Sequence, residues 1–415
     1  MKKVWFVDVV TSYGTACLHS VPVHIALEQC AEILNAEYIA VVDENCPPFK
    51  GTEKWRRVFH ESHNLHTFAG RERKDKLHGF YDLCARTRSL LKEINKNASH
   101  IIVYLDYATL RQIFAVWLSV ASLGTTRKNT IVWIHFHGVM KWNHRRFLQY
   151  LFKFFPIKAW ITANNSEHVA ANREYGWVVD DIFPLPLNPA LNAFTCDRDH
   201  QSTNNINVFR ERSDKLVCWL FINRTDQGLE FIPRIIDHWS AGNFPRKFIK
   251  CFVSEAVSIN DNAEIELVRL PYLTQEDYHL HFNECEIVFV PYNTLAYSGK
   301  VSMVFIEAIV TSKITIVSDG TTMASELRRF KLDDLVMDFN NKFSWTFINE
   351  IRKDSRIRER LNLMADSYVK EYGTFGRAQS LYKYLKQIDS AIALSGPKRE
   401  KKEVDDNRFL QQKMI

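Results

Sequence analysis

Residues 270–327 have the sequence LPYLTQEDYHLHFNECEIVFVPYNTLAYSGKVSMVFIEAIVTSKITIVSDGTTMASEL. Two short apolar runs, 287–290 and 314–317, are each followed by turn-forming residues, and an apolar segment lies between them at 301–310. Short β-branched runs that end in Pro or Gly are typical of buried strands, and the segment between them has the spacing of a helix. Strand, helix and strand in this order predict a parallel β-α-β unit.

The same alternation extends over the rest of the chain. Predicted strands lie at 4–10, 38–42, 101–105, 130–135 and 159–162 in the first half and at 216–222, 248–253, 265–270, 287–290 and 314–317 in the second. Helical segments such as 18–34 and 110–123 separate them. We therefore predict the α/β class, with two facing Rossmann-like, doubly wound domains and a ligand cleft at the carboxyl ends of their strands.

Length and local composition divide the chain into parts. A chain of 415 residues is long enough for two domains. We expect an N-terminal domain at 1–195, a polar linker at 196–214 and a C-terminal domain at 215–392. Residues 393–415 are charged and poor in apolar side chains, which predicts a flexible tail.

The overall composition is that of a packed globular protein, with 46% hydrophobic and 25% charged residues. The eight cysteines contain no C-x-x-C pair, which is typical of reduced core residues. No apolar run approaches the roughly 20 residues of a membrane span, so we expect a cytoplasmic protein. The net charge of +6 is compatible with anionic membranes or phosphorylated ligands and requires no nucleic-acid partner; an ordinary basic surface is the alternative.

The helical segment 301–310 carries the chemistry of the quoted stretch. Ser298 and Gly299 precede it, and a helix N-terminus offers unpaired N–H groups that suit a diphosphate. Lys300 and Glu307 share one face, and the carboxylate of Glu307 could accept hydrogen bonds from both ribose hydroxyls of a nucleotide. The alternative is that Ser298 and Gly299 only cap the helix and that Glu307 is a solvated side chain.

A known family shares the order of these residues. The matching elements are Leu273-Thr274-x-Glu276-Asp277, Pro291-Tyr292, Ser298-Gly299, Phe305-x-Glu307-Ala308 and Gly320. In this order the chain resembles the donor half of retaining GT-B glycosyltransferases similar to glycosyltransferase family four, best over residues 216–327. The resemblance implies that Glu307, as the second glutamate of an E-x7-E motif, binds the donor ribose. The first glutamate would fall at Gly299, so the motif is degenerate.

The resemblance also implies two cations on the donor diphosphate. Arg224 matches the first, whereas Gln227 stands where the family has lysine, and Lys300 is the substitute we predict. Two cations would stabilise the leaving diphosphate electrostatically. We find no Asp-x-Asp metal signature in a suitable loop and therefore expect no metal and no cofactor beyond the nucleotide-sugar donor. Tyr272 completes the donor-binding candidates.

The N-terminal half offers candidates in loops that follow predicted strands. Gly14 lies in a small-residue loop that would allow close approach to the donor. A G-x-G-x-x-G fingerprint is absent, which argues against a dehydrogenase. His135 and His137 end a predicted strand, and the resemblance implies that one of them lies near the donor sugar or the acceptor. A structural role for each histidine is the alternative.

Residues 141–155 form a basic and aromatic helical segment. Such a composition can lie on an anionic membrane surface, where lipid-linked acceptors are found. Burial of the same aromatic side chains against the sheet is the alternative.

These features together predict an enzyme that transfers a hexose-type sugar from a nucleoside diphosphate to a hydroxyl of a glycan or lipid-linked acceptor, with retention, in polysaccharide or glycolipid biosynthesis. His135, His137, Arg224 and Lys300 are the catalytic candidates. The chain would act in the cytoplasm or peripherally on the inner face of the membrane. A catalytically degenerate GT-B protein that only binds a nucleotide sugar or glycan is the alternative, and a nucleotide-sugar epimerase ranks third.

Overall fold

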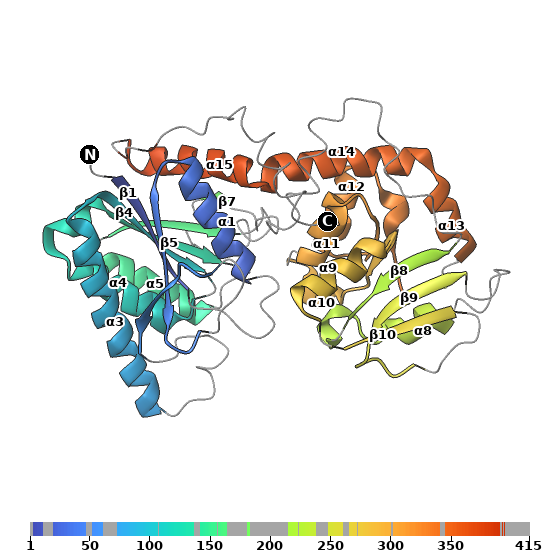
Figure 1. The fold of residues 1–415 in the computed structure, drawn as a ribbon, viewed down its shortest axis with the longest axis horizontal. Coiled ribbons are helices and arrows are strands. Elements are labelled where there is room, and N and C mark those ends of the chain that lie inside the picture. The colour runs from blue at the N-terminus through green and yellow to red at the C-terminus, as the bar shows by residue number, and fades with distance from the viewer. Residues whose placement is uncertain are drawn as a thin grey trace. The chain divides into compact units, whose positions relative to one another are not determined.

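The computed structural model describes residues 3–10, 20–46, 52–60, 73–106, 108–136, 142–155, 157–163, 181–182, 215–222, 224–237, 248–259, 265–271, 273–299, 302–340, 345–390, 392 and 394. The chain divides into two compact units (Figure 1). Unit 1 comprises Met1–Ala190 and Tyr372–Ile415, and unit 2 comprises Leu191–Glu371. The candidates Gly14, His137, Tyr272 and Lys300 and the predicted linker at 196–214 lie outside the described residues.

Unit 1 contains a seven-stranded sheet in the order β3-β2-β1-β4-β5-β6-β7, and all of its strand pairs are parallel. Its strands are β1 (Lys3–Val9), β2 (Glu37–Asp43), β3 (Arg56–Phe59), β4 (Ala98–Asp106), β5 (Thr130–Phe136), β6 (Lys158–Ala163) and β7 (Asp181–Ile182). The central strands are buried on both faces, as their continuous apolar runs predict. The strand order reverses between β1 and β4, which is where doubly wound sheets bind ligands.

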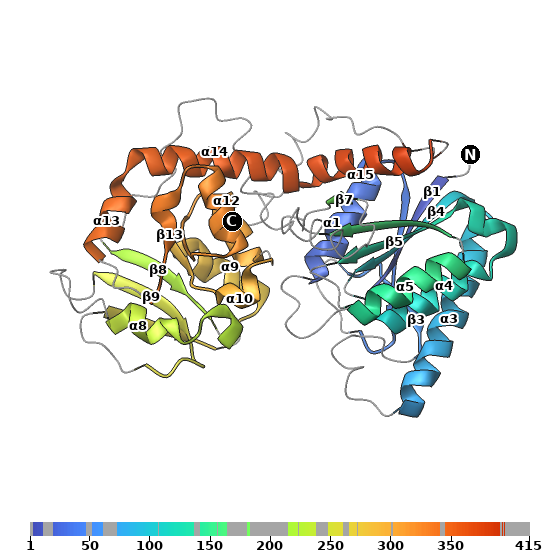
Figure 2. The same cartoon turned by 180° about the vertical axis from the view of Figure 1, so that it is seen from behind.

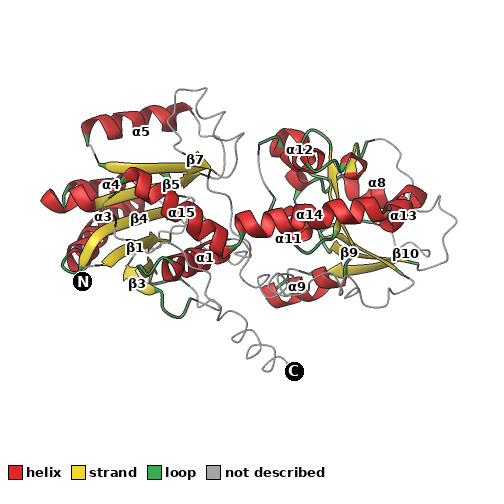
Figure 3. Cartoon of the chain, turned by 90° about the horizontal axis from the view of Figure 1, so that it is seen from above, coloured by secondary structure: helices red, strands yellow, loops and turns green. Residues whose placement is uncertain are grey.

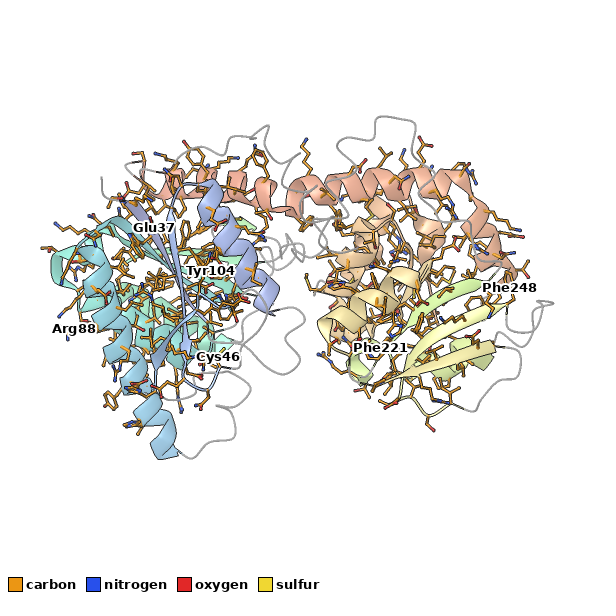
Figure 4. The ribbon with its side chains drawn as sticks, viewed as in Figure 1. Glu37, Cys46, Arg88, Tyr104, Phe221 and Phe248 are labelled. Carbon is orange, nitrogen blue, oxygen red and sulfur yellow. The ribbon has the colours of Figure 1, made fainter. Side chains whose placement is uncertain are left out.

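Helices cover both faces of this sheet (Figures 2 and 3). The helices of unit 1 are α1 (Ser20–Ile33), α3 (Arg73–Asn95), α4 (Leu110–Ala121), α5 (Trp142–Phe154) and α15 (Thr374–Ile388), with the 3-10 helix η1 (Gly124–Asn129). Side chains of α3, α4 and α5 share one hydrophobic core with the sheet. Side chains of α1 and α15 share the core on the opposite face, where Figure 4 shows Tyr104 inside the unit.

The sequence predicts that the C-terminal domain extends to residue 392, but the last helix belongs to the other unit. Helix α15 belongs to unit 1, because its apolar side chains Ala378, Leu381 and Leu385 are buried with residues of α1 such as Leu27. Leu394, inside the segment predicted to be a tail, is buried in the same core. The rest of that segment lies outside the described residues.

Unit 2 repeats the plan with a six-stranded parallel sheet in the order β10-β9-β8-β11-β12-β13. Its strands are β8 (Leu216–Leu220), β9 (Ile249–Ser254), β10 (Ile265–Leu270), β11 (Ile287–Val290), β12 (Ile314–Ser318) and β13 (Val336–Met337). Its helices are α8 (Phe231–Asp237), α9 (Gln275–Glu284), α10 (Thr294–Tyr297), α11 (Met303–Val310), α12 (Thr322–Arg329), α13 (Trp345–Lys353) and α14 (Ser355–Tyr372), with 3-10 helices η2 (Thr225–Gln227) and η4 (Asp333–Leu335). The predicted doubly wound α/β class is confirmed in each unit.

The two ends of the strands in unit 2 are marked by two phenylalanines in Figure 4. Phe221 follows β8 and lies at the carboxyl edge of the sheet, whereas Phe248 precedes β9 and lies at the amino edge. Among the helices that the structure describes, none has the length and apolar content needed to cross a bilayer.

Candidate functional site

The loops after β8 and β11 touch at the carboxyl edge of unit 2. Gly228 ends η2 with φ +83°, and a Cβ atom there would lie 1.9 Å from the carbonyl oxygen of Pro291. Only glycine combines this left-handed backbone with so close an approach. Arg224, the predicted diphosphate ligand, is exposed at the start of the same turn. The contact therefore fixes the Arg224 loop beside the loop that follows β11.

The loop after β12 joins the same cluster. Gly320 has φ +71°, and a Cβ atom there would lie 2.6 Å from the methyl carbon of Thr294. The hydroxyl of Thr294 donates to the carbonyl of Asp319 at 3.0 Å. The hydroxyl of Thr322 donates to the carbonyl of Ser298 at 3.1 Å. The loops that follow β8, β11 and β12, which are neighbouring strands of the sheet, are thus held together around the predicted donor segment.

The start of α11 lies further along the chain than the sequence predicts. Asn293 caps a separate turn, α10, by accepting hydrogen bonds from the backbone N–H groups of Leu295 and Ala296, and Ser298 ends that turn. Helix α11 begins at Met303, and its N-cap is Ser302, which accepts from the N–H of Phe305 at 3.3 Å. Ser298 and Gly299 therefore belong to the preceding loop and do not form the helix N-terminus.

Ser302 is itself tied to the strand-end loop. Its hydroxyl donates to the hydroxyl of Tyr292 at 3.3 Å, and both residues are buried. The ring of Tyr292 lies 4.3 Å from that of Tyr297 between centroids. The end of β11 and the start of α11 are thus packed by aromatic rings, which fixes the direction in which α11 leaves the loop.

Glu307 is buried, with 2% of its surface exposed, and is not the solvated side chain of the alternative prediction. Its carboxylate Oε2 accepts a hydrogen bond from the hydroxyl of Tyr278 at 2.7 Å. The bond fixes the rotamer of the predicted ribose ligand.

Tyr278 is held from several sides. Thr274 caps α9 by accepting from the N–H of Asp277 at 3.2 Å, which sets the first turn before Tyr278. The ring of Tyr278 stacks on Phe282 and meets Trp219 of β8 edge-on at 5.3 Å. Burial, with the nearby charge of Glu307, raises the pKa of the Tyr278 hydroxyl well above 10. The phenol therefore stays protonated and acts as a hydrogen-bond donor.

In unit 1 the described histidine candidate lies in the sheet. His135 is 3% exposed, and its Nδ1 shares a hydrogen bond of 2.8 Å with the hydroxyl of Thr162 on β6. The indole N–H of Trp133 donates to the same hydroxyl at 2.9 Å. Register pairs His135 with Asp106, the last residue of β4. The contacts with Thr162 agree with a structural role, while the position beside Asp106 is at the carboxyl edge.

A buried ion pair near this edge was not predicted. Nδ1 of His24 on α1 lies 2.8 Å from Oδ2 of Asp8 on β1, and the hydroxyl of Tyr38 donates to the same oxygen at 2.7 Å. Burial opposes protonation of His24, but attraction to Asp8 and Asp106 outweighs it, so the pKa of His24 is raised above 6.5. The arrangement favours a charged imidazolium in the core of unit 1.

Sequence reasoning did not identify the residues that contact the predicted candidates. Tyr278 and Glu307 are 29 residues apart, and no local pattern links them. Asp106 offered a signal, since it is an acid at the end of an apolar strand. Within the described residues, no group of three or more His, Cys, Asp or Glu side chains is placed to hold a metal ion.

Comparisons with known proteins give no relative by sequence. No protein-family model matches the chain, and no curated protein matches it. The similarity to glycosyltransferase family four therefore stays an expectation.

Solved structures do match. A glycosyltransferase from Rickettsia africae is similar with a TM-score of 0.58 and 10% identity, over 93% of this chain and 98% of that chain. An α,α-trehalose-phosphate synthase (UDP-forming) from Burkholderia vietnamiensis is similar with a TM-score of 0.55 and 11% identity, over 95% and 99%. The corresponding enzyme from Burkholderia xenovorans, in complex with glucose-6-phosphate, has a TM-score of 0.53 and 10% identity, over 92% and 99%. The chain thus has the fold of GT-B glycosyltransferases, with two Rossmann-like domains.

Proposed function

We propose that this chain is a glycosyltransferase that binds a nucleoside diphosphate sugar on unit 2 and transfers the sugar to a hydroxyl of a glycan or lipid-linked acceptor. One observation carries the proposal. The carboxylate of Glu307 on α11 is buried and accepts a hydrogen bond from Tyr278, and α11 follows the loop after β11, one of the three joined strand-end loops. The carboxyl edge of such a sheet is where nucleotides bind. The name of the UDP-forming synthase that shares the fold also supports a nucleoside diphosphate product.

In this proposal each donor group has an assigned partner. Glu307 accepts from the ribose hydroxyls, and the exposed guanidinium of Arg224 with Lys300 neutralises the diphosphate without a metal. The loop at Ser298 and Gly299, with Tyr272, lines the donor. The bond from the anomeric carbon to the diphosphate breaks, the acceptor oxygen bonds to that carbon, and the proton of the acceptor hydroxyl passes to an oxygen of the leaving diphosphate. Retention, and a place in polysaccharide or glycolipid biosynthesis, follow from the family resemblance.

Ligand-induced stabilisation tests the donor site. The melting temperature would be measured with UDP, GDP, ADP and TDP, because a ligand present at 100 times its Kd stabilises the folded state by about 2.7 kcal/mol. We expect one diphosphate to stabilise the wild type and to lose that effect in Glu307→Gln. Glu326→Gln is the matched control, since Glu326 also accepts from a tyrosine, Tyr368, at 2.8 Å in the same unit.

Product analysis separates the alternatives. A transferase should hydrolyse its donor slowly without acceptor, whereas a degenerate binder should be stabilised by the nucleotide and leave the donor intact. An epimerase should release an isomeric nucleotide sugar. If no nucleotide changes the melting temperature of the wild type, the donor site is absent and the proposal fails.

A further inference from the structure

The outward face of α5 carries aromatic side chains. Tyr150 is 58% exposed, Phe154 is 67% exposed and Phe155, just after the helix, is 39% exposed. The rings of Tyr150 and Phe154 are stacked, with 17° between their planes and 6.4 Å between their centroids. Clustered apolar side chains on a surface indicate a site that another surface covers.

The opposite face of α5 accounts fully for its attachment to unit 1. Leu148 and Leu151 are buried in the core. Phe147 packs against Phe114 of α4 at 5.4 Å between ring centroids, and Phe152 packs in the same way against Trp117 of α4 at 4.6 Å. Membrane contact and burial, which the sequence offered as alternatives, therefore concern two different faces of one helix.

Cations surround the exposed rings. Arg146 and Lys153 are both exposed on α5. Arg146 lies four residues before Tyr150, and Lys153 directly precedes Phe154. Residues three or four apart lie on one side of a helix, so Arg146, Tyr150 and Phe154 form a single row. The surface of α5 thus combines aromatic and basic side chains.

The 3-10 helix η1 adds two further cations, Arg127 and Lys128, both exposed. It directly precedes β5, and the end of α5 directly precedes β6. Ile131 of β5 and Lys158 of β6 are register partners, so both segments lie at the amino edge of the sheet. The indole N–H of Trp117 donates to the carbonyl of Phe155 at 3.1 Å, which ties this end to α4.

The charge of the surrounding sequence is one-sided. Residues 107–166 contain eight Lys and Arg residues and no Asp or Glu, whereas the whole chain has a net charge of only +6. The excess of positive charge in the protein is therefore concentrated in the segment that contains η1 and α5. An anionic surface would complement it.

We propose that the α5 surface, made of Arg127, Lys128, Arg146, Tyr150, Lys153, Phe154 and Phe155, docks on an anionic lipid bilayer. The rings enter the boundary between headgroups and acyl chains, and the cations meet the headgroup phosphates. Exposed rings among cations suit the boundary between the acyl chains and the anionic headgroups of a bilayer, whereas single-stranded nucleic acid binds in a groove. The inference rests on the proposed function, because docking on a bilayer would give the enzyme access to a lipid-linked acceptor.

Vesicle sedimentation of the full-length protein tests the surface. The vesicles would be phosphatidylcholine alone and phosphatidylcholine with phosphatidylglycerol at about 7:3. We expect the wild type to bind the anionic vesicles at least tenfold better. Tyr150→Ser/Phe154→Ser should reduce that binding about tenfold, and Lys128→Gln/Lys153→Gln should reduce it about 25-fold, at about fivefold per cation. Leu363→Ser is the matched control, because Leu363 is 59% exposed on α14 of unit 2, and it should bind as the wild type does.

Three results would overturn the docking surface: equal binding to both kinds of vesicle, unchanged binding by the aromatic variant, or binding to a single-stranded oligonucleotide in place of vesicles. The melting temperature of each protein with nucleoside diphosphate separates this inference from the proposed function. Vesicle binding without any nucleotide response would contradict the donor site alone. A nucleotide response without vesicle binding would contradict the docking surface alone.

Discussion

At the scale of single residues, the hydrogen bond from Tyr278 to Glu307 is the contact with the clearest consequence. Tyr278→Phe removes the hydroxyl and leaves a buried carboxylate oxygen without this donor. A hydrogen bond to a charged group contributes about 1.5–3 kcal/mol. We expect the free energy of unfolding to fall by about that amount and nucleoside diphosphate binding to weaken. Urea unfolding and nucleotide titration would measure the two effects.

A double-mutant cycle gives this prediction its control. Tyr278→Phe and Glu307→Gln should be non-additive in the free energy of unfolding by about 1 kcal/mol or more, since the residues share one bond. Tyr368→Phe, which breaks the other tyrosine–glutamate bond of unit 2, should leave nucleotide affinity unchanged. Additive effects, or equal losses of affinity in Tyr278→Phe and Tyr368→Phe, would show that Tyr278 has no positioning role.

The His24–Asp8 pair predicts a pH dependence of stability. The pKa of His24 is raised above its usual 6.5 in the folded state. A group whose pKa is higher in the folded state than in the unfolded state contributes to the free energy of unfolding. That contribution is complete below pH 6.5 and is lost as the pH rises through the pKa of the folded state. We therefore expect the difference in unfolding free energy between the wild type and His24→Asn to shrink as the pH is raised above 6.5.

His100 supplies a control of opposite sign. Burial lowers the pKa of His100, with Lys158 adding to the effect and Asp389 opposing it. Its neutral form is therefore favoured on folding, and the associated stability is present above pH 6.5 and is lost as the pH falls. Chemical unfolding of His24→Asn and His100→Asn across this range should give opposite slopes relative to the wild type. Parallel slopes would contradict the charged state assigned to His24.

Candidate residues could be selected from the sequence only where the signal is local. Glu307 stands out because its helix is otherwise apolar, and its burial agrees with a role in a site. Its partner Tyr278 comes from another helix, and the sequence does not show which helices meet. Likewise, the sequence places Ser298 and Gly299 at the start of the helix, but Ser302 accepts the capping bond. The intervening turn α10 depends on the side chain of Asn293, a local signal that the apolar spacing of the helix does not reveal.

At the scale of elements, the contact between the β8 and β11 loops depends on Gly228. Gly228→Ala would place a methyl group at 1.9 Å from the Pro291 carbonyl as well as strain a positive φ. Gly124 has φ +62°, and a Cβ atom added there would meet nothing within 4 Å, so Gly124→Ala isolates the backbone contribution. We expect Gly124→Ala to cost about 1–2 kcal/mol and Gly228→Ala to cost clearly more, with loss of nucleotide binding.

Thermal unfolding and nucleotide titration would measure both glycine variants. Equal losses of stability would mean that the loop after β8 can move away from Pro291 without cost. Retained nucleotide affinity in Gly228→Ala would mean that the spacing of these two loops does not matter for the donor site. Either result would contradict the role given to this contact.

At the scale of the whole molecule, the packing of α15 predicts which unit a core mutation affects. Leu381 is fully buried in unit 1, although it follows unit 2 in sequence. Leu381→Ala should cost about 2–5 kcal/mol and accelerate hydrogen exchange in α1 and β1. Leu361→Ala on α14, where Leu361 is also buried, is the matched change within unit 2. Faster exchange in unit 2 after Leu381→Ala would contradict the assignment of α15.

The sheets could be predicted from sequence, while the path of the last helix could not. Each long strand is a β-branched run that carries its own signal, and parallel order follows from the helices between the runs. The short strands β3, β7 and β13 have few apolar residues and were not predicted. The pattern of α15 indicates an amphipathic helix but not its partner, because Leu381 could cover either sheet equally well.

The placement of α15 also bears on how the protein is made. During translation the side of α1 that carries Leu27, Cys30 and Ala31 emerges from the ribosome hundreds of residues before the helix that covers it. Unit 2 is synthesised entirely in the interval, so it can reach its native state first, against the usual N-terminal-first order. A nascent chain paused near Glu371 would expose an unfinished apolar face, which is the kind of surface that chaperones bind.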